Sequence, residues 1–176
     1  MAHLAPSITA LTDLGARFAD AGHDLALVGG PVRDALLGRA VSDVDFTTSA
    51  RPDETEALLA AWGTATWDMG REFGTIGARR GDMVVEVTTY RADAYDGQTR
   101  KPIVAFGDSL EDDLVRRDFT VNAMALRLPD LTFVDPHGGL ADLEDQVLRT
   151  PSAPEVSFGD DPLRMMRAAR FVAQLA

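Results

Sequence analysis

The sequence has 176 residues, of which 45% are hydrophobic, so it can bury one sizeable core, and an intrinsically disordered chain is excluded. It contains no cysteine, which excludes disulfides, thiolate metal sites and cysteine nucleophiles. The net charge of −11 argues against a surface that binds nucleic acid broadly, although every basic residue except Lys101 is an arginine and several of the arginines are clustered.

The longest apolar runs are far shorter than the roughly 20 residues that cross a bilayer. The first residues have neither the basic region nor the apolar region of a signal peptide. We therefore expect a cytoplasmic protein that does not contact a membrane.

Hydrophobic periodicity and turn residues predict a mixture of helices and strands. The first part is predicted to form a helix at 7–21, a strand at 25–28, a helix at 32–37, a strand at 44–48, a helix at 53–61 and a hairpin of 75–79 with 83–90. Residues 91–102 lack periodicity, so we expect a surface loop there. The second part is predicted to form a helix at 110–117, a hairpin within 126–134, a helix at 140–146 and a final helix that opens at Asp161-Pro162. This order predicts an α+β fold with a compact sheet near the start of the chain.

The first candidate for a binding element is the turn between the first strand and the helix after it. Gly29 and Gly30 lie in this turn, and such a turn can point backbone N–H groups at an anion such as a triphosphate. Arg33 is expected on the first turn of the helix. Taken alone, a Gly-Gly pair is better explained by a tight turn that needs glycine for backbone reasons.

Three acidic residues are candidates for a metal site. Asp43 and Asp45 flank Val44 at the start of a strand, so both carboxylates point to the same face. Glu86 interrupts an apolar strand and would join them if the two strands are neighbours. Three carboxylates could hold two Mg²⁺ ions for an in-line displacement. The alternatives are a solvated strand face or a helix cap for the aspartates and an exposed glutamate on a half-solvated sheet.

Four ordered segments resemble the signatures of class II CCA-adding enzymes and bacterial poly(A) polymerases. They are residues 27–39 followed by Asp43 and Asp45; residues 116–125; residues 135–139 with Asp142 and Leu143; and residues 160–164 with Arg167, Arg170 and Phe171. The resemblance extends from Leu27 to Leu175. It implies a head like that of the DNA polymerase β superfamily, with a small mixed sheet flanked by helices.

The resemblance implies a role for each matching residue. Asp43, Asp45 and Glu86 would be the catalytic, metal-binding carboxylates. The residues that would bind the nucleotide are Gly29, Gly30, Arg33, Arg117, Asp118, Asn122, Asp161, Arg164, Arg167 and Arg170. The reaction would be Mg²⁺-dependent addition of CCA to tRNA 3′ ends from CTP and ATP, with release of pyrophosphate. Without the resemblance, 116–118 would be interpreted as a helix C-terminus with cations that complement its dipole, and Asn122 as a cap.

The last segment has a physical logic of its own. Asp161, Arg164 and Arg167 recur every three residues, so they are expected on one side of a helix. A carboxylate accepts from an exocyclic amine while a guanidinium donates to ring acceptors, and such a pair can select cytosine or adenine. The alternative is an Asp-Pro cap followed by surface salt bridges.

The sequence departs from the family in two ways. Asp160 stands where the family usually has glutamate. Family members also continue through neck, body and tail regions that hold the tRNA, so we expect a head at 1–150 and only the start of the helical neck at 151–176.

Three kinds of alternative function remain open. Within the same class, the chain could be a poly(A) polymerase or an enzyme that adds only CC or only A. Outside it, the chain could be a nucleotide-binding module without catalysis or a transferase that acts on small molecules.

Overall fold

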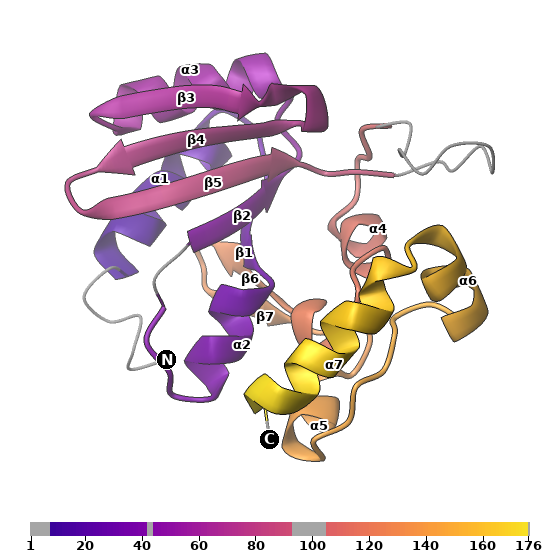
Figure 1. Ribbon diagram of the computed structural model, residues 1–176. Helices are drawn as coiled ribbons and strands as arrows, with labels where there is room; N and C mark the ends of the chain where they lie inside the picture. Colours follow the sequence, from indigo (N-terminus) through magenta and orange to yellow (C-terminus); the bar gives the residue numbers. More distant parts are fainter. Residues whose placement is uncertain (1–7, 42–43, 93–104, 176) are drawn as a thin grey trace.

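The structure, a computed structural model, describes residues 8–41, 44–92 and 105–175. The described chain forms one seven-stranded mixed sheet with flanking helices (Figure 1). The strands are β1 (Leu25–Val28), β2 (Val44–Thr48), β3 (Ala65–Gly70), β4 (Thr75–Arg80), β5 (Met83–Thr89), β6 (Ala125–Leu128) and β7 (Thr132–Val134). The helices are α1 (Ile8–Asp20), α2 (Gly30–Leu36), α3 (Pro52–Trp62), α4 (Leu110–Val115), α5 (Gly139–Glu144), α6 (Pro154–Asp160) and α7 (Leu163–Leu175), and 3₁₀ turns occur at Arg71–Phe73 and Thr120–Asn122.

The strand order is β3-β4-β5-β2-β1-β6-β7. β2 and β5 pair in parallel, and the other neighbouring strands pair antiparallel. The predicted α+β class, with a mixed sheet and flanking helices, is therefore confirmed.

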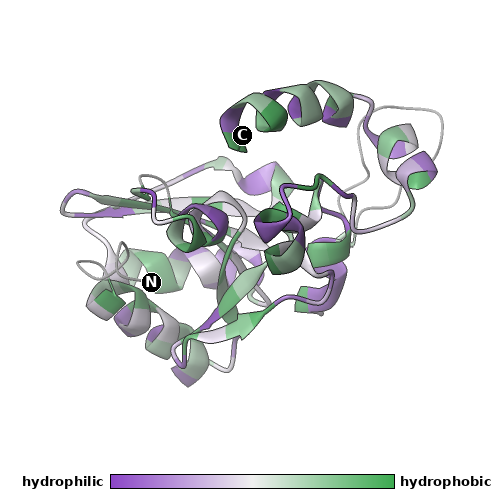
Figure 2. Cartoon of the chain, turned by 90° about the horizontal axis from the view of Figure 1, so that it is seen from below, coloured by the Kyte–Doolittle hydropathy of each residue, from purple (hydrophilic) through white to green (hydrophobic). Residues whose placement is uncertain are grey.

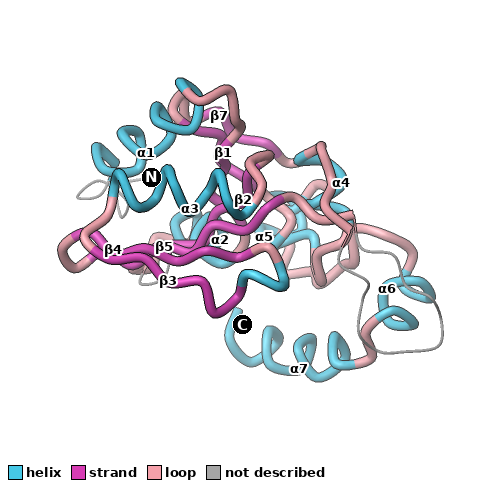
Figure 3. The backbone as a smooth tube through the Cα atoms, turned by 90° about the horizontal axis from the view of Figure 1, so that it is seen from above, coloured by secondary structure: helices cyan, strands magenta, loops and turns pink. Residues whose placement is uncertain are grey.

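The main core lies between one face of the sheet and helices α1 and α3, which Figure 3 shows together on one side of β4 and β5. Leu11, Leu14 and Phe18 are buried at helical spacing on α1, and Leu59 and Trp62 are buried on α3. A smaller core forms on the other side of the sheet, where α4 packs against β1 and the end of β5. The helices thus leave the other face of β3, β4 and β5 without a covering helix in the described chain (Figure 1).

The C-terminal helix α7 lies apart from the sheet, on the side opposite α1 and α3 (Figure 3). Figure 2 shows hydrophobic and hydrophilic residues alternating along it. Phe171 is buried against the rest of the molecule, while Leu163, Met165, Met166 and Val172 are exposed.

Most predicted elements are present to within a few residues, but two were missed. β3 is an edge strand whose residues are largely exposed, so it has no alternation of buried and exposed positions. α6 has only seven residues and begins at a proline. The predicted loop at 91–102 lies outside the described residues from position 93 onward. Within the three described ranges, no helix has both the length and the apolar character needed to cross a membrane.

Candidate active site

Asp45 and Glu86 are directly paired across the parallel strands β2 and β5. Both side chains are exposed, whereas Val85 and Val87 on either side of Glu86 are buried in the main core. The predicted neighbourhood of the two strands is therefore confirmed, because residues paired in a sheet point to the same face. Asp43 lies outside the described residues.

The two carboxylates fit a hard divalent cation. Magnesium is usually bound by one or two protein carboxylates together with water and phosphate oxygens. In the described ranges no three His, Asp or Glu side chains gather closely enough to form a metal site. A site built on Asp45 and Glu86 therefore depends on further oxygen ligands.

The turn before α2 requires glycine at its first position. Gly29 has φ 72° and ψ −134°, a conformation that side chains with a Cβ rarely adopt. A Cβ at Gly29 would also lie 3.1 Å from Nη1 of Arg117. Pro31 follows at the start of α2, where its missing N–H costs nothing. Gly29 is therefore needed both for the backbone conformation of the turn and for the space beside Arg117.

Arg33, Asn122, Asp118 and Arg167 form a continuous chain of hydrogen bonds. Nη1 of Arg33 donates to Oδ1 of Asn122 at 2.5 Å, and Nδ2 of Asn122 donates to Oδ1 of Asp118 at 3.0 Å. Nε of Arg167 donates to Oδ2 of Asp118 at 2.7 Å. Asn122 therefore bridges two charged groups, and the alternative of a simple helix cap is wrong. These hydrogen bonds connect α2, the 116–122 segment and α7, and the four residues form one continuous wall.

Asp113 holds the side chains of Arg116 and Arg117 in place. Its fully buried carboxylate accepts from Nε and Nη2 of Arg116 and from Nη2 of Arg117. Burial alone would raise the pKa of Asp113, but the charges of Arg117 and Arg116 and their hydrogen bonds outweigh it and lower the pKa. The arginine pair is therefore held by a permanently ionised group at neutral pH.

The junction of α6 and α7 positions the residues predicted to read the base. Asp161 precedes α7, and its Oδ1 accepts from the backbone N–H of Leu163 at 3.0 Å. The prediction that Asp161 lies on one side of a helix with the arginines is therefore wrong, because α7 begins two residues later. Arg164 donates to Oγ of Ser157 at 2.6 Å and to the carbonyl of Arg116 at 2.7 Å.

Three guanidinium groups lie against the ring of Phe171. The Cζ atoms of Arg33, Arg167 and Arg170 lie 5.3, 5.8 and 5.0 Å from the centre of its ring. The ring also meets Phe119 edge-on, with centres 5.7 Å apart. Cation–π contacts of this kind hold cations in place without neutralising them.

These groups surround one cleft with a volume of about 980 Å³. Its lining residues are Gly29, Gly30, Arg33, Asp45, Arg91, Arg116, Arg117, Asp118, Asn122, Asp160, Asp161, Pro162, Leu163, Arg164, Arg167, Arg170, Phe171 and Gln174. All the predicted nucleotide-binding residues line it, together with Asp45. Glu86 does not line it and lies one strand beyond Asp45.

Sequence reasoning missed several residues that matter to the cleft. Arg91 lines it from the segment just after β5, and Gln174 from the end of α7. Nothing in the local sequence distinguishes either residue. Asp113 was also missed, although its spacing of three and four residues from Arg116 and Arg117 is typical of ion pairs on a helix.

Residues 25–149 match the family described as the poly A polymerase head domain. The chain is 45% identical over 155 residues to the CCA-adding enzyme of Geobacillus thermodenitrificans, a match that covers 88% of this chain and 37% of the relative. It is 45% identical over 157 residues to the CCA-adding enzyme of Bacillus subtilis, covering 89% of this chain and 38% of the relative.

Solved structures agree with these matches. The Bacillus stearothermophilus CCA-adding enzyme in complex with CTP superposes with a TM-score of 0.78 at 39% identity, covering 92% of this chain and 38% of that chain. A tRNA nucleotidyltransferase complexed with a primer tRNA and an incoming ATP analogue gives a TM-score of 0.75 at 37% identity, covering 92% of this chain and 45% of that chain. The chain thus spans less than half the length of each of these relatives.

Proposed function

The chain belongs to the family of poly A polymerase head domains, and from this premise we propose that it is the catalytic part of a nucleotidyltransferase that adds CCA to tRNA 3′ ends. The observation that carries the proposal is the pairing of Asp45 with Glu86 at the edge of an arginine-lined cleft. Carboxylates that bind a metal beside cations that bind phosphates are the parts that phosphoryl transfer needs, and the reaction needs no nucleophilic side chain from the protein.

The cleft would bind CTP or ATP. Gly29 and Gly30 would face the triphosphate, and Arg33 and Arg117 would neutralise its charge. Asp118 and Asn122 would lie against the ribose, where a carboxylate and an amide can bond a 2′-hydroxyl. The rigid hydrogen-bond chain from Arg33 to Arg167 would keep these groups in position before the substrate arrives.

Asp45 and Glu86, together with Asp43, would hold Mg²⁺. The metal would supply charge stabilisation at the transferred phosphate and a more acidic attacking hydroxyl. The chain's own carboxylates would orient that hydroxyl toward the α-phosphate, and the arginines of the cleft would hold the departing pyrophosphate.

Asp161, Arg164, Arg167 and Arg170 would select the base. All four line the cleft on the α7 side. A carboxylate next to guanidinium groups matches the donor and acceptor pattern of cytosine and adenine and opposes that of uracil and guanine. In the structure Arg164 and Arg167 are hydrogen-bonded to the protein, so base binding would exchange these bonds for bonds to the nucleotide.

We assign residues 1–150 to the catalytic head and 151–176 to the beginning of a helical neck. The exposed apolar side chains of α7 support this division, because in a longer chain they would pack against the following helices. The net charge of −11 argues against broad binding of RNA by these 176 residues.

The experiment is incubation of the 176-residue chain with Mg²⁺, all four nucleoside triphosphates and tRNA that lacks CCA, followed by product sequencing. Addition of C, C and A in order supports the proposal. A homopolymeric A tail would identify a poly(A) polymerase, and products that end at CC or gain only A would identify a partial enzyme. Calorimetric binding of CTP with no transfer at any RNA concentration would identify a nucleotide-binding module without catalysis.

A further inference from the structure

Four residues form one row across four neighbouring strands. Trp67 on β3 pairs with Gly77 on β4, Gly77 pairs with Glu86 on β5, and Glu86 pairs with Asp45 on β2. Cross-strand partners share a face of the sheet, so the indole of Trp67 lies on the same face as both carboxylates. This is the face of β3, β4 and β5 that no helix of the described chain covers (Figure 1).

Gly77 allows the indole to lie flat over the row. A Cβ at Gly77 would be 2.1 Å from Cε2 and 2.2 Å from Nε1 of Trp67, so the ring occupies the space that a side chain would fill. Trp67 is only partly buried in this position. The ring therefore packs against the backbone of β4 at Gly77 and keeps part of its surface exposed. Trp62, by contrast, is buried and has Arg80 over its ring.

The nucleotide cleft lies on the other side of Asp45. Its lining residues come from the turn before α2, the start of β2, the segment just after β5, the 116–122 segment and the region of α6 and α7. They include none of Trp67, Gly77 and Glu86. In phosphoryl transfer the attacking and leaving oxygens lie in line on opposite sides of the phosphorus. If pyrophosphate leaves toward the arginines of the cleft, the attacking hydroxyl must arrive from the side of Glu86.

We propose that Trp67 is the stacking platform for the 3′-terminal base of the acceptor RNA; the inference rests on the proposed function. The ring lies over Gly77, one strand spacing of about 4.8 Å from the backbone of Glu86. A terminal nucleotide whose hydroxyl reaches the carboxylates has its base within reach of the ring. Stacking also suits an acceptor whose last base changes with every addition, because every base offers a π-face to an aromatic ring.

Arg79 adds a cation beside the platform. It lies two residues after Gly77 on β4, so it points to the same face, and its side chain is exposed. An arginine in this position can bind the phosphate that precedes the terminal nucleoside. The platform, defined as Trp67, Gly77 and Arg79, thus offers a ring for the base and a charge for the backbone.

The two tryptophans allow a direct binding test. In a Trp62→Phe background Trp67 is the only indole, since the sequence contains two tryptophans. Titration with the trinucleotide ApCpC should quench its fluorescence saturably, and Arg79→Ala should weaken the binding and reduce the slope of log K against log salt by about 1. A fluorescence that does not change at millimolar ApCpC would overturn the proposal.

Kinetics separate stacking from a structural role. Trp67→Leu keeps a hydrophobic side chain but removes the aromatic ring, and it should raise KM for the acceptor RNA about 5- to 100-fold while leaving KM for CTP unchanged. Trp67→Phe should restore most of the loss. The matched control is Phe133→Ala, which removes an exposed aromatic from β7 at the opposite edge of the sheet and should leave both constants unchanged. Equal KM values for RNA in Trp67→Leu and Phe133→Ala would overturn the proposal.

A second variant, at Gly77, should move the indole of Trp67 without removing it. Gly77→Ala should displace the indole and raise KM for RNA, but it should have no further effect in a Trp67→Leu background, where the branched side chain can move away. Additive effects in the double variant would contradict the platform. Absence of nucleotide transfer in the unmodified chain would instead count against the proposed function, and the fluorescence titration would still decide the stacking.

Discussion

Arg167 on α7 donates through Nε to Oδ2 of Asp118 at 2.7 Å and so joins the C-terminal helix to a residue 49 positions earlier. Asp118 is buried and also accepts from Asn122 and from the backbone N–H of Phe119. One carboxylate therefore joins α7 to the 116–122 segment along the wall of the cleft.

Asp118→Ala should lower the free energy of unfolding by about 1–3 kcal/mol, because it leaves the buried donors of Asn122 and Phe119 without their acceptor. Urea denaturation without ligand measures the change. Arg170→Ala is the control, since Arg170 contributes a contact to the ring of Phe171 but no bond to Asp118. An unfolding free energy equal to that of the control would show that the wall does not depend on Asp118.

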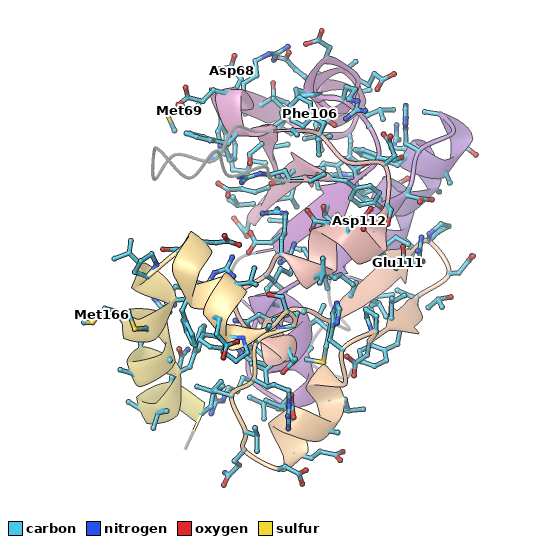
Figure 4. The ribbon with its side chains drawn as sticks, turned by 90° about the vertical axis from the view of Figure 1, so that its right-hand side faces the viewer. Asp68, Met69, Phe106, Glu111, Asp112 and Met166 are labelled. Carbon is cyan, nitrogen blue, oxygen red and sulfur yellow. The ribbon has the colours of Figure 1, made fainter. Side chains whose placement is uncertain are left out.

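Glu86→Gln and Asp45→Asn should each reduce nucleotide transfer by about 1000-fold or more, because metal charge stabilises the transition state by several kcal/mol. Single-turnover transfer with saturating CTP measures the loss. Asp68→Asn is the matched control. Asp68 is an exposed carboxylate on β3, and Figure 4 shows it at the upper margin of the molecule beside Met69. Comparable rates in Glu86→Gln and Asp68→Asn would remove Glu86 from the reaction.

Gly29→Ala should weaken CTP binding and also destabilise the fold by about 1–3 kcal/mol, because its backbone conformation is essentially restricted to glycine. Gly22→Ala provides a matched control, because Gly22 has φ 82° but no atom within 4 Å of the added Cβ. Gly29→Ala should lose at least as much stability as Gly22→Ala in thermal denaturation, and only Gly29→Ala should change the Kd for CTP by calorimetry. Unchanged CTP affinity in Gly29→Ala would show that the turn does not contact the nucleotide.

Asp113 should make stability depend on pH in the acidic range. Its pKa in the folded state is lowered, so its ion pairs stabilise the protein above the unfolded value of about 4, and the contribution is lost as the pH falls below that value. Asp113→Asn should be less stable than the parent at pH 7, and the difference should shrink between pH 5 and pH 3. Urea midpoints across this range test the prediction, and a constant difference would assign the effect to packing instead.

Much of the fold followed from periodicity because most elements bury one face. α1 places Leu11, Leu14 and Phe18 in the core at helical spacing, and β5 alternates buried valines with Glu86. β3 gave no such pattern, since its residues are all exposed or only partly buried and show no alternation. Its most informative residue, Trp67, could be understood only once its pairing with Gly77 was known.

The candidate site was predictable where neighbours in sequence are neighbours in space. The Gly29-Gly30 turn and the Arg116-Arg117 pair are of this kind, and both line the cleft. The sequence left Asp161 open between a helical residue and an Asp-Pro cap, because a spacing of three residues fits both, and the structure has it before α7. Arg91 was missed because its place in the cleft depends on where β5 ends relative to β2, a tertiary relation without a local pattern.

The pairing of β2 with β5 has a consequence for how the site tolerates change. The separation of Asp45 from Glu86 is set by a main-chain ladder, so the turns that connect α3, β3, β4 and β5 could vary in length without altering it as long as the ladder forms. A slip of either strand by a single position would instead turn its carboxylate into the hydrophobic interior and bring a valine or phenylalanine to the surface. Such a shift in register would abolish nucleotide transfer completely. In a library of variants with altered turns, the presence or absence of transfer would therefore report whether β2 and β5 keep their register.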